Sequence, residues 1–231
     1  MEYTTQTQPY ELPVPQEAAS SARPLIVFDW DGTLADSMEL CVAEIRLALE
    51  QMGLPALPRE ELMKCNGPAF TESAKILHIP ETRQKEFIAV RQKAEMTILD
   101  DYQKLFPHAA DMVAALSEKA NLAIVSNGLT GYIHRSLEIT GIARCFHTVQ
   151  ALIPGKTKTE ALALTLARIA PRRAVMVGDM LGDIQAGKSN SLPTVAACYG
   201  YGKPDEWAVA DQKAATVPEL QKLLMAFACE G

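Results

Sequence analysis

The sequence predicts an α/β protein in which helices cover both faces of a parallel β-sheet and a wholly helical segment is inserted early in the chain. Short, continuously apolar runs alternate with amphipathic stretches over most of the sequence, as in strands buried on both sides of a parallel sheet. The stretch from Leu57 to Asp101 departs from this pattern, because it holds helical patterns and no convincing strand. We therefore expect a three-layer α/β/α core and a separate helical subdomain.

The composition limits the possible functions as well as the possible folds. With 231 residues, 48% of them hydrophobic, the chain is long enough to bury a substantial core. The net charge of −6 and the lack of any block of lysines and arginines argue against nucleic acid as a partner. No apolar run approaches the roughly 18 residues that a membrane span requires, so no membrane partner is expected.

The N-terminal segment and the cysteines favour a cytoplasmic protein. Residues 1–22 combine several prolines with Gln, Thr and Ser and are expected to form a flexible tail. They lack the basic start and apolar core of a signal peptide. The five cysteines form no CxxC pair, which is typical of reduced thiols. We expect a monomer or a homodimer.

The first strand and the helical segment follow this tail. Leu25–Phe28 is a run of four apolar residues and predicts a buried strand. Asp36 or Ser37 can cap the next helix, whose apolar residues recur at helical spacing as far as Gly53. The charges from Glu81 onward are expected to form one solvated helix face. The further helical patterns are Glu60–Cys65, Phe70–Leu77 and Glu81–Leu99.

Strand and helix patterns alternate from about residue 106 to the end of the chain. We therefore assign residues 23–37 and 104–231 to the α/β core, and residues 38–103 to the helical subdomain. The predicted strands are Asn121–Val125, Phe146–Leu152, Ala174–Val177 and Thr194–Cys198. The predicted helices are Ala109–Lys119, Thr130–Thr140, Glu160–Ile169, Asp183–Ser189 and Pro218–Cys229.

Polar residues follow the ends of four predicted strands. Because the carboxyl ends of parallel strands share one edge of the sheet, these residues can converge there. Carboxylates for a hard cation, hydroxyl and amide donors for an anion, and a lysine point charge match what phosphoryl transfer requires. The four groups are Asp29, Asp31 and Thr33; Ser126 and Asn127; Lys156 or Lys158; and Asp179 and Asp183.

In their order and intervals, these groups resemble the four motifs of the haloacid dehalogenase-like superfamily. The resemblance covers about residues 24–227 and implies a Rossmann-like core. The helical insert resembles the cap of the subgroup that contains phosphoglycolate phosphatases and β-phosphoglucomutases. Leu105–Ala109 resembles that subgroup's Tyr-Pro-Gly-Val segment, with His108 in the place of the glycine. The motifs are Asp29-Trp30-Asp31-Gly32-Thr33, Ser126-Asn127-Gly128, a lysine before a helix, and Gly178-Asp179-x₃-Asp183.

The resemblance implies a Mg²⁺-dependent phosphatase that acts on a small phosphorylated metabolite. Asp29 would be the nucleophile and would form an aspartyl-phosphate. Asp31 would protonate the leaving oxygen and then activate water. Mg²⁺ would be held by Asp29, by the backbone carbonyl of Asp31 and by Asp179, with Asp183 supporting the metal or the lysine.

The resemblance also implies how the substrate is held. Thr33, Ser126 and Asn127 would bind the substrate, with Ser126 and the amides near Asn127 on the phosphoryl oxygens. The cap would close over the substrate and exclude water. Residues 66–68 of the cap are expected to face the active site.

Two lysines compete for the third motif. The subgroup usually shows Lys-Pro-x-Pro, and the corresponding residues here are Lys156-Thr157-Lys158-Thr159, with both prolines replaced. Lys156 fits that frame and the interval to Asp179, so we favour it as the catalytic lysine and keep Lys158 as the alternative. One lysine suffices chemically, as a compact cation near the phosphate and the nucleophile.

Other functions fit the sequence less well. A phosphomutase of the β-phosphoglucomutase type stays open, because it uses the same core and differs mainly in its cap. Gly182–Ser189 satisfies the P-loop pattern G-x₄-G-K-S, but only three residues separate it from Pro193, so no long helix can follow to bind a nucleotide phosphate. A non-catalytic binding module is disfavoured by the intact set of acids.

Overall fold

The computed structural model describes residues 22–151 and 153–229 and confirms the predicted fold class. The predicted N-terminal tail lies, apart from Ala22, outside the described residues, and so does Leu152 at the end of one predicted strand.

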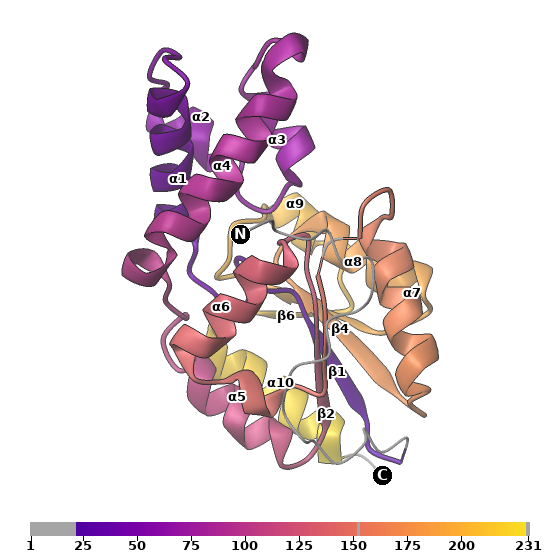
Figure 1. The fold of residues 1–231 in the computed structure, drawn as a ribbon. Coiled ribbons are helices and arrows are strands. Elements are labelled where there is room, and N and C mark those ends of the chain that lie inside the picture. Colours follow the sequence, from indigo (N-terminus) through magenta and orange to yellow (C-terminus); the bar gives the residue numbers. More distant parts are fainter. Residues whose placement is uncertain (1–21, 152, 230–231) are drawn as a thin grey trace.

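A six-stranded sheet, parallel at every strand pair, forms the centre of the protein (Figure 1). Its order is β3-β2-β1-β4-β5-β6, so the chain first builds outward on one side of β1 and then on the other. Ligands bind at such a switch point, beyond the carboxyl ends of the strands. The strands are β1 (Leu25–Phe28), β2 (Asn121–Val125), β3 (Thr148–Gln150), β4 (Ala174–Gly178), β5 (Thr194–Ala197) and β6 (Gln212–Ala214).

Helices follow the strands and form the outer layers of the core. A 3₁₀ turn at Ala143–Cys145 precedes β3, and β3 is shorter than the predicted strand. The core helices are α5 (Ala109–Ser117), α6 (Thr130–Thr140), α7 (Lys158–Ile169), α8 (Leu181–Ser189), α9 (Pro204–Trp207) and α10 (Val217–Cys229).

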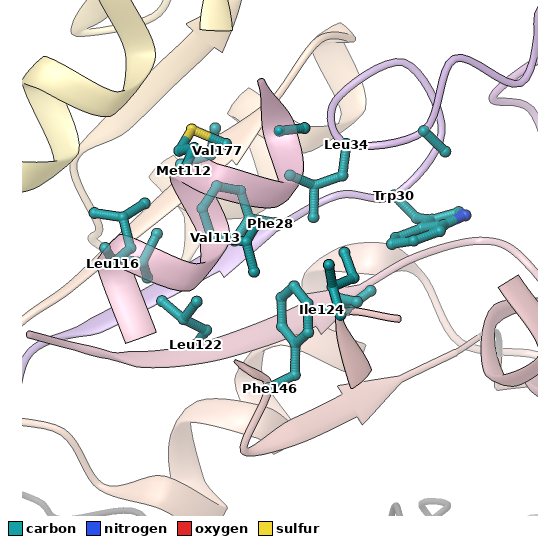
Figure 2. Packing of buried hydrophobic residues seen from close by; sticks show 14 of the residues in the cluster. Phe28, Trp30, Leu34, Met112, Val113, Leu116, Leu122, Ile124, Phe146 and Val177 are labelled. Carbon is teal, nitrogen blue, oxygen red and sulfur yellow. The ribbon is translucent and has the colours of Figure 1, made fainter. Parts of the chain in front are cut away.

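Alternate side chains of β1 pack against different helical layers, because successive residues of a strand point to opposite faces. Ile26 and Phe28 belong to an apolar cluster with residues of α5 and α10, whereas Leu25 and Val27 belong to a second cluster with residues of α7 and α8. Figure 2 shows Phe28 close to the α5 side chains and to Phe146, whose ring meets it edge-on at 6.5 Å between centroids. The central strand is thus fixed from both sides.

Residues 38–102 form a helical block with its own apolar cluster. Buried residues such as Ile45, Leu62 and Phe87 pack together there, and every residue of this cluster comes from the block. Figure 1 shows the block standing above the sheet. Its helices are α1 (Met38–Gln51), α2 (Arg59–Met63), α3 (Phe70–Ile76) and α4 (Glu81–Tyr102).

Three features differ from the sequence expectations. β6 and α9 were not predicted, since β6 is only three residues long with two of them exposed, and α9 only four. The expected solvated face of α4 is wrong at two positions, because Arg91 and Glu95 are only 4% and 6% exposed.

Among the described residues, no helix combines the length and the apolar character that crossing a bilayer would require.

Candidate active site

Asp29 lies at the carboxyl end of the central strand. Its N–H donates to the carbonyl of Val177 at 2.9 Å, so the pairing with β4 continues one residue past β1. The chain then turns, because the carbonyl of Trp30 accepts from the N–H of Leu34 at 2.9 Å. Trp30 is fully buried among the core residues (Figure 2) and anchors this turn. The turn therefore places the carboxylates of Asp29 and Asp31 in different surroundings.

Asp29, Asp179 and Asp183 form a buried cluster of carboxylates. Each offers one oxygen within 4.8 Å of the others, and none is more than 4% exposed. Burial, and then the neighbouring Asp183, raise the pKa of Asp29 well above its usual range. The same two causes raise the pKa of Asp179 to about 7. Mutual repulsion and desolvation of this kind indicate that the cluster needs cationic partners.

Lys158 supplies one such partner. Its Nζ lies 2.9 Å from Asp29 Oδ1 and 2.5 Å from Asp183 Oδ1, and its side chain is only 11% exposed. The charges of both acids raise the pKa of Lys158, although burial opposes them. The lysine is therefore held as a cation beside the nucleophile candidate.

The structure places Lys158, the alternative, and not the favoured Lys156 beside the acidic cluster. Lys156 lies in the loop before α7 with its side chain 42% exposed, and it pairs with Glu160 at 4.0 Å. Thr157 caps α7 and forms a capping box with Glu160, which makes Lys158 the first helical residue. Side chains tilt toward the amino end of their helix, and here that end faces the sheet edge. The pattern Thr-x-x-Glu was the sequence signal that could have selected Lys158.

Two glycines allow the acids to approach so closely. Gly32 has a φ of 80°, and a Cβ there would overlap the carboxylate of Asp179. A Cβ at Gly178 would overlap the side chain of Asp183. Both glycines therefore belong to the packing of the acidic cluster, as well as to the turns that carry it.

The carboxylate of Asp31 stands outside the acidic cluster. It accepts a hydrogen bond from the hydroxyl of Tyr132, on α6, at 2.6 Å. Burial raises the pKa of Asp31, and hydrogen bonds from Ser37 and Tyr132 oppose this in part. A carboxyl with a raised pKa is suited to donate a proton at neutral pH. No sequence motif pointed to Tyr132, which reaches Asp31 only through the packing of α6.

The predicted substrate-binding residues lie in two different places. Ser126, 3% exposed, and Asn127 line a cavity together with Asp29 and Asp31. Thr33 is fully buried and does not line it; its hydroxyl donates to Asp179 Oδ1 at 3.3 Å. The structure therefore gives Thr33 a different partner from the one expected, as a support of the acidic cluster.

The acidic cluster fits a hard divalent cation. Its donors are carboxylate oxygens alone, which Mg²⁺ prefers, and three acids facing one lysine leave negative charge in excess. Asp179 is positioned for this by the N–H of Tyr201 at 2.7 Å and Asp183 by the N–H of Met180 at 3.0 Å. The backbone carbonyl of Asp31 stays a predicted ligand.

The helical block forms the other wall of the cavity, whose empty space together with the open solvent at its mouth is about 500 Å³. Asn66, Gly67 and Pro68 line it as expected, and the side-chain amide of Asn127 donates to the carbonyl of Gly67 at 3.3 Å. The same wall carries three buried charged residues that sequence reasoning missed. They are Glu44, Arg91 and Glu95.

The P-loop pattern has no corresponding loop. Gly182–Ser189 lies within α8, so these residues are helical, and Lys188 pairs with Asp211 on the surface at 3.5 Å. A P-loop requires backbone N–H groups free to cradle phosphates. The geometry argues against a nucleotide site there.

Comparison with known proteins agrees with this geometry. The family model described as haloacid dehalogenase-like hydrolase matches residues 26–197. The chain is 28% identical to pyrophosphatase PpaX of Oceanobacillus iheyensis over 180 residues, which cover 75% of this chain and 83% of PpaX. It is 29% identical to phosphoglycolate phosphatase of Escherichia coli O157:H7 over 205 residues, covering 76% and 81% of the two chains.

A solved structure shows the same fold. The crystal structure of a predicted phosphatase from Clostridium acetobutylicum aligns with a TM-score of 0.81 and 20% identity, over 89% of this chain and 99% of that one.

Proposed function

Because the chain belongs to the haloacid dehalogenase-like hydrolase family and is a phosphatase of that family, we propose that it hydrolyses phosphomonoesters of small metabolites. The reaction would pass through an aspartyl-phosphate, with Mg²⁺ as cofactor. One observation carries the proposal. Asp29 stands at the end of the central strand within 2.9 Å of Lys158, while Asp31, two residues on, is held separately by Tyr132. Two neighbouring carboxylates thus have the environments of a nucleophile and of a proton donor.

The first half of the reaction uses both acids. Asp29 Oδ attacks the phosphorus, a bond forms between them, and the bond from phosphorus to the leaving oxygen breaks. Asp31 donates its proton to that oxygen, so the product leaves as a neutral alcohol. Ser126 and the N–H groups around Asn127 would bind phosphoryl oxygens, and Lys158 would offset the charge that gathers near Asp29.

The second half reverses the role of Asp31. Its carboxylate takes a proton from water, the water oxygen attacks phosphorus, and inorganic phosphate leaves as Asp29 is regenerated. Asp29, Asp179 and Asp183 would hold Mg²⁺, which when bound offsets the repulsion between carboxylate and phosphate dianion.

The helical block of residues 38–102 is proposed to act as the cap. It supplies one wall of the cavity that contains Asp29 and Asp31, and excluding water there would strengthen the electrostatic interactions of the site. The five free cysteines suit the cytoplasmic location that we propose for the protein.

The direct test is turnover of acetyl phosphate or p-nitrophenyl phosphate by purified protein. We expect hydrolysis with Mg²⁺ and its loss with EDTA. Asp29→Asn should lower kcat by about 10⁴-fold or more, because the amide cannot attack phosphorus. Asp101→Asn, a change of the same kind at an exposed position of α4, should leave turnover unchanged. Full activity of Asp29→Asn would refute the nucleophile assignment.

A further inference from the structure

Three nearly buried charged residues on the cap wall of the cavity have polar atoms without a partner. Glu44, Arg91 and Glu95 are 2%, 4% and 6% exposed. Within the described part of the chain, no group hydrogen-bonds to Glu44 Oε2, Arg91 Nη1 or Glu95 Oε2. We call these three residues the cap cluster. All three line the same cavity as Asp29 and Asp31.

Two members of the cap cluster, Arg91 and Glu44, are fixed in place by their contacts. Arg91 Nε donates to Glu44 Oε1 at 2.8 Å, and its Nη2 lies 2.6 Å from the same oxygen. The guanidinium also stacks on the ring of Phe70, with Cζ 4.4 Å from the centroid. One edge and one face of the guanidinium are therefore occupied, and Nη1 is its free donor.

Such unpartnered groups are costly in a folded protein. A buried polar atom without a hydrogen bond loses its hydration and nothing replaces it, and native proteins contain few such atoms. Three on one wall of one cavity, opposite the reacting acids, indicate groups that a substrate completes.

The charges of the cap cluster select the kind of substrate. Arg91 is already paired with Glu44. A carboxylate or second phosphate could accept from Arg91 Nη1, but it has no donor and could pair with Glu44 or Glu95 only while these are protonated. An ammonium could donate to the two acids but would leave Arg91 Nη1 unpaired. A hydroxyl both donates and accepts, so hydroxyls can satisfy all three atoms.

We propose that the cap cluster binds the non-reacting end of the substrate, and that this end is uncharged and carries two or more hydroxyl groups, as in a sugar phosphate or polyol phosphate. The inference rests on the proposed phosphatase function and adds its substrate class. Burial raises the pKa of Glu44 to about 7 and that of Glu95 well above its usual range. Carboxyls that hold a proton part of the time can also donate to a hydroxyl, which agrees with this chemistry.

The test is a panel of phosphate esters with the wild-type enzyme and Mg²⁺. The panel contains glucose 6-phosphate, glycerol 3-phosphate, phosphoglycolate, phosphoethanolamine and pyrophosphate, with acetyl phosphate as the reference that reaches only the core wall. We expect kcat/KM for one of the two hydroxyl-bearing esters to exceed that for each charged compound by about tenfold or more, the effect of one or two hydrogen bonds.

Two failures can be told apart. Turnover of acetyl phosphate together with a preference for phosphoglycolate, phosphoethanolamine or pyrophosphate would overturn this inference and leave the phosphatase proposal intact. No turnover of any compound, acetyl phosphate included, would overturn both.

A conservative variant tests the cap cluster itself. Glu95→Gln keeps the shape of the side chain, and we expect it to lower kcat/KM for the preferred hydroxyl-bearing ester about tenfold relative to that for acetyl phosphate, mainly through KM. Glu86→Gln, at an exposed position of the same helix, should change neither value. An unchanged ratio in folded Glu95→Gln would contradict the inference, because a merely structural role would affect both substrates alike.

Discussion

The two walls of the cavity each carry acids around one buried cation, but they hold them differently. On the core wall, backbone N–H groups of Trp30, Tyr201 and Met180 donate to the carboxylates at 2.7–3.0 Å. On the cap wall, Glu44 and Glu95 each keep an oxygen that no group of the described chain contacts by a hydrogen bond. The core acids are thus fixed by the backbone, whereas the cap acids depend on Arg91 and on what enters the cavity.

The difference suggests two tasks. Acids held by backbone donors keep their geometry through a reaction cycle, which preorganised electrostatic catalysis requires. Buried polar atoms without a hydrogen-bond partner suit recognition, because only a ligand with matching groups offsets the cost of their desolvation.

Removing the cation of the cap wall should mainly affect stability. Arg91→Met leaves Glu44 buried without its partner, and we expect a loss of about 3–5 kcal/mol in the free energy of unfolding, measured by urea denaturation at pH 8. Arg59→Met, which breaks an exposed ion pair with Glu39, should cost far less, because solvent screens that pair. Equal losses in the two variants would show that the cap cluster is not a buried ionic unit.

Removing the cation of the core wall should mainly affect rate. Lys158→Ala withdraws the charge beside Asp29, and we expect kcat for p-nitrophenyl phosphate to fall about 10²–10³-fold. Lys156→Ala is the matched control and should change kcat less than about twofold, because its side chain lies in solvent. The reverse order of the two effects would restore Lys156 as the catalytic lysine.

Stability should fall with rising pH through the titration of Glu44. Its pKa is about 7 in the folded protein against an ordinary value of 4.5, because burial outweighs the attraction of Arg91, and Asp31 raises it further. The unfolded chain therefore releases this proton first. The contribution of Glu44 is fully present below about pH 4.5 and is lost as pH rises through 7, by about 3 kcal/mol at most.

A pair of variants isolates that contribution. In urea denaturation at pH 5 and pH 8, Glu44→Gln should show a smaller difference between the two free energies of unfolding than the wild type. Glu50→Gln, exposed on the same helix, should keep the wild-type difference. If Glu44→Gln kept the wild-type difference between the free energies of unfolding at pH 5 and pH 8, Glu44 would not titrate in this range.

Backbone strain outside both walls should give the smallest effect. His108 has a φ of 70° just before α5, and its side chain is exposed without a capping hydrogen bond. The left-handed region costs a non-glycine residue about 1 kcal/mol or more, which exceeds the entropy cost of glycine. His108→Gly should therefore stabilise the protein by about 0.5 kcal/mol in thermal or urea unfolding.

The control for this variant should change the stability of the protein in the opposite direction. His134→Gly, inside α6, should destabilise the protein by about 1 kcal/mol, because glycine disfavours a helix interior. A loss of stability in His108→Gly would show that the imidazole makes a contribution that its exposure does not suggest.

The sheet and the acids of the core wall could be predicted from the sequence because they depend on local pattern. The apolar run Leu25–Phe28 and the acid after it are adjacent in the chain, and parallel pairing then brings the other strand ends to the same edge. Lys158 was ranked second to Lys156 because both prolines that mark the motif are replaced, so the start of α7 had to be inferred from Thr157 and Glu160.

The cap wall could not be predicted in the same way. A charged residue on a helix is normally solvated, and whether Arg91 meets Glu44 depends on how α4 packs against α1, 47 residues apart in sequence at these positions. The available signal was spacing, since Arg91 lies four residues after the buried Phe87 on the same helix face. Tyr132 likewise reaches Asp31 across 101 residues.

Of the four acids at the sheet edge, we expect Asp29 alone to become phosphorylated. The most direct measurement is to quench the enzyme with acid during turnover of acetyl phosphate, reduce it with borohydride, and locate the reduced residue by peptide mass spectrometry. We expect conversion of Asp29, and none at Asp31, Asp179 or Asp183. Modification of another acid, or turnover without any trapped residue at Asp29, would contradict it.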